Sequence, residues 1–71
     1  MEELKITLAA ARVNAGMTQE DVARKMQVSK NKVVDWEKGK KEPTISQGRQ
    51  LSSLYGIPLS NIFFADKIQL N

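Results

Sequence analysis

The chain has 71 residues, of which 11 are Lys or Arg and 8 are Asp or Glu, so its formal net charge is only +3. It contains no Cys and no His, which excludes disulfides, thiolate nucleophiles and the usual zinc ligand sets. A chain of this length is expected to form one domain that buries only about 60% of its unfolded surface, so helix packing must supply most of its stability.

The composition also argues against a membrane protein and against an enzyme. The longest apolar runs, LAAA at 8–11 and IFFA at 62–65, are far too short to span a bilayer. No apolar segment follows the initial Met-Glu-Glu, so we expect no signal peptide and a soluble, cytoplasmic protein. Without His the chain lacks the side chain best suited to acid–base chemistry near neutral pH, so we expect no enzyme and no cofactor or metal.

Helix signals are strong along the chain, whereas strand patterns are weak, with Leu-Lys-Ile at 4–6 as the single candidate. Apolar residues recur at helical spacing in the first predicted helix, and Thr7 can serve as its N-cap. The second helix opens on a capping-box pair, Thr18 with Asp21. The predicted helices cover about residues 7–15, 19–26, 30–38, 45–55 and 59–64, followed by a tail at 65–71.

The fourth predicted helix opens on Thr44 and carries a glycine in its middle. Gly48 costs about 1 kcal/mol relative to Ala in a helix interior, so we expect another element to pack closely there. Three further glycines, Gly16, Gly39 and Gly56, stand where helices end in a left-handed residue. The predicted inner face of this helix comprises Ile45, Gly48, Leu51, Ser52 and Tyr55.

The connection between the second and third helices is very short. Only Gln27 and Val28 separate the second helix from Ser29, the expected N-cap of the third. Two short helices joined by so tight a turn must cross steeply, as in a helix-turn-helix. Ala23 is small enough to lie where the two axes approach each other.

The third predicted helix has an apolar and a polar face. Val33 and Trp36, the single tryptophan of the chain, share the apolar face, so we interpret Trp36 as a core anchor. The opposite face of this helix carries Asn31, Asp35 and Lys38. The amide, carboxylate and ammonium groups therefore point away from the body of the domain.

These residue types suit the major groove of DNA, which accepts an α-helix. Asn can pair with adenine, Lys can donate to guanine, and a carboxylate can accept from cytosine, which makes Lys30, Asn31 and Asp35 candidate base contacts. The candidate phosphate contacts are Gln19, at the start of the second helix, and Lys38, Lys40 and Lys41 at the end of the third. The alternative is that the lysines form only a solvated face, but the tight turn and the anchored helix favour DNA.

The sequence resembles the lambda-repressor-like (Cro/XRE-type) helix-turn-helix family over residues 8–64. The resemblance is carried by Thr18, Gln19, Ala23, Val28, Ser29, Val33, Trp36, Glu37, Gly39 and Pro43. It implies an all-α, compact five-helix DNA-binding domain across residues 1–71, with the 30–38 helix in the major groove. It also implies base contacts from Lys30, Asn31 and Asp35, with Lys32 as a further candidate, and a partly buried ion pair between Arg12 and Glu37.

Two positions depart from the family pattern. The residue that follows the second helix is commonly Gly in the family, and here it is Gln27, whose left-handed conformation would cost roughly 1–2 kcal/mol. Asp35 brings a carboxylate to a face that approaches phosphates. It must accept from a cytosine, pair with Lys32 or Lys38, or weaken binding.

One short helix reads only a few base pairs, so we expect a homodimer on a DNA operator with half-sites about 34 Å apart. The candidate dimer interface comprises Ile57, Pro58, Leu59, Phe63 and Phe64. The expected function is that of a sequence-specific regulator, by analogy a small repressor of phage or mobile-element type. The alternatives are the antitoxin of a toxin–antitoxin pair, with a toxin as protein partner, and a helical protein-interaction module that does not bind DNA.

Overall fold

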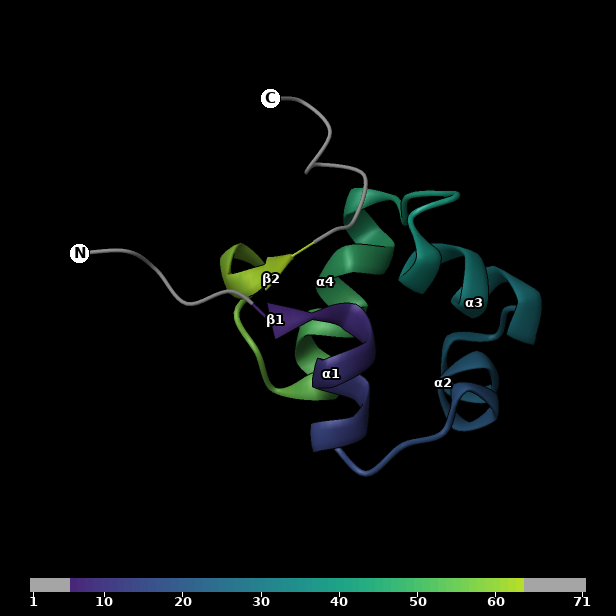
Figure 1. Cartoon of the computed structure of the whole chain (residues 1–71), viewed down its shortest axis with the longest axis horizontal. Coiled ribbons are helices and arrows are strands. Elements are labelled where there is room, and N and C mark those ends of the chain that lie inside the picture. Colours follow the sequence, from purple (N-terminus) through teal and green to yellow (C-terminus); the bar gives the residue numbers. More distant parts are fainter. Residues whose placement is uncertain (1–5, 64–71) are drawn as a thin grey trace.

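The computed structural model describes residues 6–63, which form four α-helices, one 3₁₀ helix and two very short strands (Figure 1). The elements are β1 Ile6–Thr7, α1 Leu8–Asn14, α2 Gln19–Met26, α3 Lys30–Lys38, α4 Ile45–Tyr55, η1 Leu59–Asn61 and β2 Ile62–Phe63. The four α-helices lie where the sequence predicts them, to within a residue at each end. Of the strand candidate at 4–6, Ile6 lies in β1, whereas Leu4 and Lys5, like the predicted tail 65–71, lie outside the described residues.

Side-chain caps fix the starts of the helices, as the sequence predicts. Thr7 Oγ1 accepts from the backbone N–H of Ala10 at 3.1 Å. Thr18 and Asp21 form a reciprocal capping box. The Asp21 N–H donates to Thr18 Oγ1 at 3.0 Å, and the Thr18 N–H donates to Asp21 Oδ2 at 2.9 Å. The same arrangement opens α4 at Thr44. These caps satisfy N–H groups that a helix leaves unpaired at its first turn.

The prediction of a fifth α-helix at 59–64 is wrong. Within the described residues, the segment forms one 3₁₀ turn and then extends as β2, which pairs in parallel with β1 through Ile6 opposite Ile62 and Thr7 opposite Phe63. Ser60 and Asn61 are weak helix formers, and β-branched or aromatic residues at 62 and 63 favour an extended backbone. Ile62 is 4% exposed, so the extended form also completes the core.

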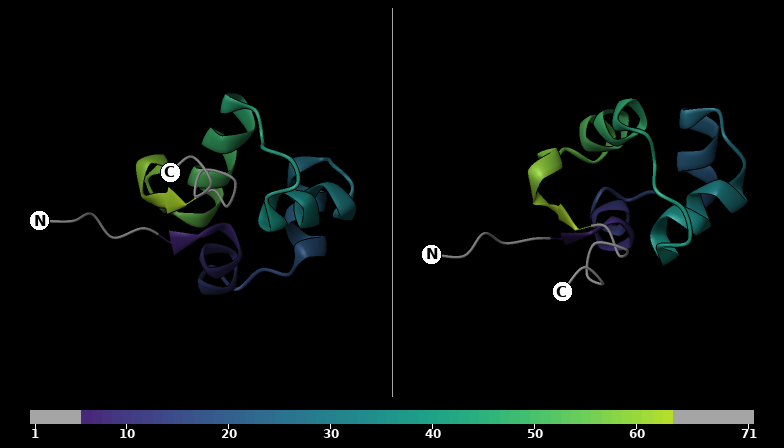
Figure 2. Two further views of the ribbon diagram at one scale, coloured as in Figure 1. Left: turned by 45° about the horizontal axis from the view of Figure 1, so that its top comes forward. Right: turned by 90° about the horizontal axis from the view of Figure 1, so that it is seen from above.

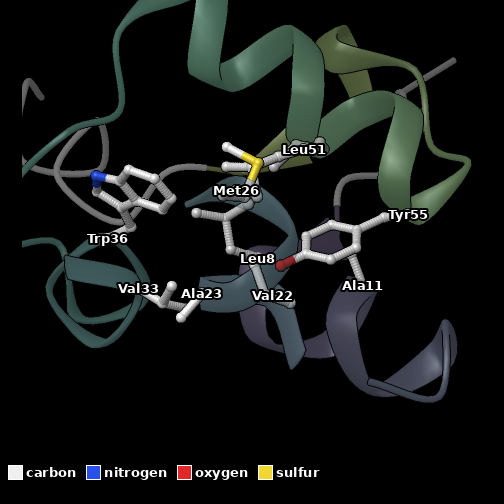
Figure 3. Packing of buried hydrophobic residues seen from close by; sticks show 10 residues of the cluster. Leu8, Ala11, Val22, Ala23, Met26, Val33, Trp36, Leu51 and Tyr55 are labelled. Carbon is white, nitrogen blue, oxygen red and sulfur yellow. The ribbon is translucent and has the colours of Figure 1, made fainter. Parts of the chain in front are cut away.

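The core lies between α1, α2, α3 and α4 (Figure 3). Ile62 of β2 completes it. Trp36 is 3% exposed and Val33 is 1% exposed, so both predicted anchors of α3 are buried. The buried members of the core are Leu8, Ala11, Val22, Ala23, Met26, Val33, Trp36, Leu51, Tyr55 and Ile62. Among the described elements, α3 therefore packs on the body of the domain through the face that carries Val33 and Trp36.

The predicted inner face of α4 is correct at Gly48, Leu51 and Tyr55, which are buried, but it is wrong at Ile45. Ile45 is 73% exposed because it is the first residue of α4 and lies beyond the edge of the core. The close packing expected at Gly48 is present, since a Cβ atom there would lie 3.4 Å from Leu59 Cδ1. The glycine therefore allows η1 to approach α4.

The turn between α2 and α3 is closed by backbone hydrogen bonds and requires a left-handed residue. Gln27 has φ 60° and ψ 44°, which confirms the left-handed conformation considered from the sequence. The backbone N–H of Val28 donates to the carbonyl of Ala23 at 3.0 Å across this turn. As a result α2 and α3 lie together at one end of the molecule in every view (Figure 2). None of the helices within residues 6–63 has the length and apolar composition needed to cross a bilayer.

Candidate nucleic-acid interface

The position of α3 is fixed at both ends and along its inner face. Ser29 Oγ accepts from the backbone N–H of Lys32 at 3.1 Å, and Gly39, with φ 80°, ends the helix. Because Val33 and Trp36 are buried, the rotation of the helix about its axis is set. This rotation exposes Lys30, Asn31, Lys32 and Lys38 and leaves Asp35 half-buried.

Most of the lysines on and after this exposed face have no ion-pair partner in the part of the chain that the structure describes. No ion pair within residues 6–63 involves the ammonium groups of Lys32, Lys38, Lys40 and Lys41. Asp35 likewise has no ion-pair partner in the described part of the chain, so the structure shows no pairing with Lys32 or Lys38, one of the three alternatives considered from the sequence. The unpaired lysines can contact phosphates, and the Asp35 carboxylate keeps its capacity to accept hydrogen bonds.

Lys30 differs from the other lysines because it is paired. Its Nζ lies 2.9 Å from Glu20 Oε2, and this contact links the first turn of α3 to the first turn of α2. The hydrogen bond from Lys30 is the main reason why the pKa of Glu20 lies below its ordinary value. Sequence reasoning missed Glu20, because only the crossing of the two helices brings residues 20 and 30 together.

A hydrogen-bonded cluster behind α3 joins it to α1 and α2. Arg12 Nε donates to Glu37 Oε2 at 2.7 Å, and Arg12 Nη1 donates to the carbonyl of Met17 at 2.9 Å. Gln19 Nε2 donates to the other oxygen of Glu37 at 3.0 Å. The Arg12 and Glu37 side chains are only 15% and 8% exposed, so the structure brings together the two residues that the family resemblance pairs.

Hydrogen bonding and burial shift two pKa values in and beside this cluster. The hydrogen bond to Glu37 raises the pKa of Arg12 above its ordinary value, against the opposing effect of desolvation. Burial, with the Glu37 carboxylate as a second cause, raises the pKa of Tyr55 to about 12. The amide nitrogen of Gln19 is engaged with Glu37, so its backbone N–H at the start of α2 is the group left for a phosphate, and that contact stays a prediction.

A second surface feature is an open groove between α2 and α4, lined by Lys25, Met26, Gln50, Ser53 and Leu54. None of the predicted DNA contacts lines it. It is therefore separate from the exposed face of α3.

The residues predicted for a dimer interface are only partly described. Ile57 and Leu59 are half-buried and pack against the core, while Pro58 is exposed. Of Phe63 the structure describes only the backbone, and Phe64 lies outside the described residues. Two large apolar side chains that the sequence did not single out for a surface role, Val13 and Ile45, are 64% and 73% exposed.

A tight left-handed turn between two crossed helices, with the second helix anchored by buried residues and exposing lysines and an amide, defines a helix-turn-helix protein. Comparisons with known proteins agree with this geometry. The helix-turn-helix family model matches residues 8–62, and the chain belongs to this family, of the Cro/XRE type. It is 32% identical over 60 residues to an uncharacterized HTH-type transcriptional regulator of Methanocaldococcus jannaschii, a match that covers 84% of this chain and 91% of that protein. No solved structure matches the chain significantly.

Proposed function

We propose that this chain is a transcriptional regulator that binds double-stranded DNA with α3 in the major groove. The observation that carries the proposal is the burial of Val33 and Trp36, which turns Asn31 and its neighbouring lysines toward solvent. The similarity to an HTH-type transcriptional regulator and the family membership support it.

The exposed residues at the start of α3, together with the half-buried Asp35, are proposed to read base edges. Asn31 suits adenine, and Lys30 and Lys32 suit guanine O6 and N7. Asp35 suits the N4 amino group of cytosine, because it has no ion-pair partner within residues 6–63 and a bare carboxylate would otherwise only repel DNA. These contacts would give the protein its sequence preference.

The lysines at the end of α3 are proposed to contact phosphates. Lys38, Lys40 and Lys41 are exposed. They lie at the end of α3 and just after it, where the chain would leave the groove. Each contact of this kind releases condensed counterions, so affinity should fall steeply with salt. A phosphate contact by the backbone of Gln19 would fix the start of α2 on the DNA backbone.

The regulator is proposed to act as a homodimer that occupies an operator, in the manner of a small repressor. One α3 covers only a few base pairs, and two-fold symmetry would supply a second half-site about 34 Å away. Ile57, Pro58 and Leu59 form the described part of the proposed interface, with Phe63 and Phe64 as its remaining members. Sedimentation that finds a monomer both with and without DNA would reject the dimer.

Selection of bound sequences from a random DNA pool tests the function directly. The proposal predicts an enriched motif with two-fold symmetry, bound with a log–log salt slope of roughly −0.9 for each phosphate contacted. Retention of DNA without sequence enrichment and without salt dependence would contradict it.

A second candidate is a protein-interaction module, which the groove between α2 and α4 favours. Its wall combines Met26 and Leu54 with polar side chains and includes no residue of α3. An antitoxin would combine both functions, because it would bind DNA through α3 and a toxin through another surface. Co-purification of a toxin would support the antitoxin, and weak, salt-insensitive DNA retention would support the interaction module alone.

A further inference from the structure

Glu20 and Lys30 form an ion pair at the edge of the face proposed to read DNA. Their side chains are 60% and 51% exposed, so the pair lies at the surface with Lys30 Nζ 2.9 Å from Glu20 Oε2. Lys30 is the first residue of α3, and the first turn of α3 contains no acidic residue. Glu20 therefore provides, from α2, the negative charge that this end of α3 lacks.

The Glu20–Lys30 ion pair is expected to contribute little to the stability of the fold. Exposed ion pairs contribute little to stability. A lysine at the N-terminus of a helix is disfavoured by the helix dipole, which places partial positive charge at that end. The position of Lys30 is thus better explained by binding than by helix stability, and Glu20 changes what Lys30 can bind.

We infer that Glu20 is a specificity-determining residue, which makes Lys30 a donor to neutral base edges and a poor contact for phosphates. This inference rests on the proposed function. The Lys30 ammonium has three N–H donors, and one of them suffices for Glu20 Oε2. The remaining donors can reach O6 and N7 of a guanine, which carry no net charge.

A phosphate next to Lys30 would be close to a negative as well as a positive side chain. It would lie beside the Glu20 carboxylate as well as the Lys30 ammonium, and the two charges of the pair largely cancel at a distance. Lys30 then adds little to the sequence-independent attraction that drives non-specific binding. The pair therefore lowers affinity for arbitrary DNA more than affinity for a site with a guanine at the right position.

The test compares wild type with Glu20→Gln, Lys30→Gln and the double variant on two short duplexes, one selected from a random pool and one scrambled. Glu20→Gln should tighten binding to the scrambled duplex roughly fivefold, the size of one exposed ion pair. Its salt slope on that duplex should steepen by about 0.9, equivalent to one more phosphate contact. The preference for the selected duplex should fall, and the effect of Glu20→Gln should shrink when Lys30 is already Gln.

Asp21→Asn is the matched control. It makes the same change in net charge one residue away, but Asp21 pairs with Arg24, at 2.7 Å, and not with Lys30. The asparagine oxygen can still accept from the Thr18 N–H, so the capping box is kept. This variant should leave the preference for the selected duplex near that of wild type.

Equal effects of Glu20→Gln and Asp21→Asn would overturn the inference, because both would then report only net charge. An unchanged preference in Glu20→Gln would also overturn it, as would weaker binding to the selected duplex with the scrambled duplex unaffected. These results leave the proposed function standing, provided that wild type binds the selected duplex preferentially. A wild type that binds neither duplex in a salt-dependent way would remove the proposed function and the inference together.

Discussion

Arg12 on α1 and Glu37 on α3 form an ion pair in which Arg12 Nε lies 2.7 Å from Glu37 Oε2. Gln19 on α2 donates to the same carboxylate at 3.0 Å, so a single acidic side chain connects three helices. Because Glu37 belongs to α3, the connection ties the helix that carries the exposed lysines to α1 and α2. It fixes the orientation of the helix-turn-helix relative to α1, a role for which buried charged pairs are better suited than for adding stability.

Glu37→Gln should lower the free energy of unfolding by about 3 kcal/mol, because it leaves the largely buried Arg12 guanidinium without a counter-charge. Denaturant unfolding followed by Trp36 fluorescence measures the loss. Arg24→Gln is the control, since it breaks a pair in which the Arg24 side chain is 71% exposed and should change stability little. Equal losses in the two variants would show that Glu37 makes no special contribution.

Gln27→Gly should stabilise the protein by about 1 kcal/mol, because Gln27 holds φ 60° and glycine adopts this conformation without steric cost. In a domain of this size the thermal midpoint should rise by about 4–8 °C. Gln27→Ala keeps the Cβ atom and should bring no such gain. If Ala and Gly raised the midpoint equally, strain in the turn would not be the cause.

The sequence predicted the local features of this fold because they depend on residues close together in the chain. Caps such as Thr18 and the buried Trp36 follow from spacing of a few residues, whereas the left-handed Gln27 was considered only because the family resemblance marks that position. The helix predicted at 59–64 was wrong because Ile62 and Phe63 extend to pair with Ile6 and Thr7, more than fifty residues away.

The candidate site shows the same division between local and tertiary information. The exposed residues of α3 followed from helical periodicity once Val33 and Trp36 were assigned to the core. The ion pair between Glu20 and Lys30 did not, because it depends on how α2 and α3 cross. Ile45 was assigned to the core by periodicity alone, although the core ends before the first turn of α4.

Stability at alkaline pH should depend on Tyr55, which is 7% exposed and has its pKa raised from 10.0 to about 12 by burial. A raised pKa means that the fold favours the protonated phenol, so this contribution is complete below pH 10 and is lost as the pH rises toward 12. The loss should be of the order of 2 kcal/mol. Unfolding curves of wild type and Tyr55→Phe should diverge in this range, and parallel curves would contradict the assignment.

Two single variants should separate reading of bases from binding of phosphates. Asn31→Ala should cost about 1–3 kcal/mol at one base pair and relax the preference at that position. Lys40→Ala should weaken binding to all DNA about equally and make the salt slope shallower by about one contact. If both variants behaved alike on selected and scrambled duplexes, the assignment of the exposed face of α3 as the reading surface would be wrong.

Backbone amide NMR of the protein, titrated with a duplex selected from a random pool, locates the DNA-binding surface residue by residue. If α3 enters the major groove, the largest chemical-shift changes should fall on residues 30–35 and 38–41, with small changes at Gln50 and Ser53 in the groove between α2 and α4. Changes concentrated at that groove, with the exposed face of α3 unaffected, would contradict this placement of α3.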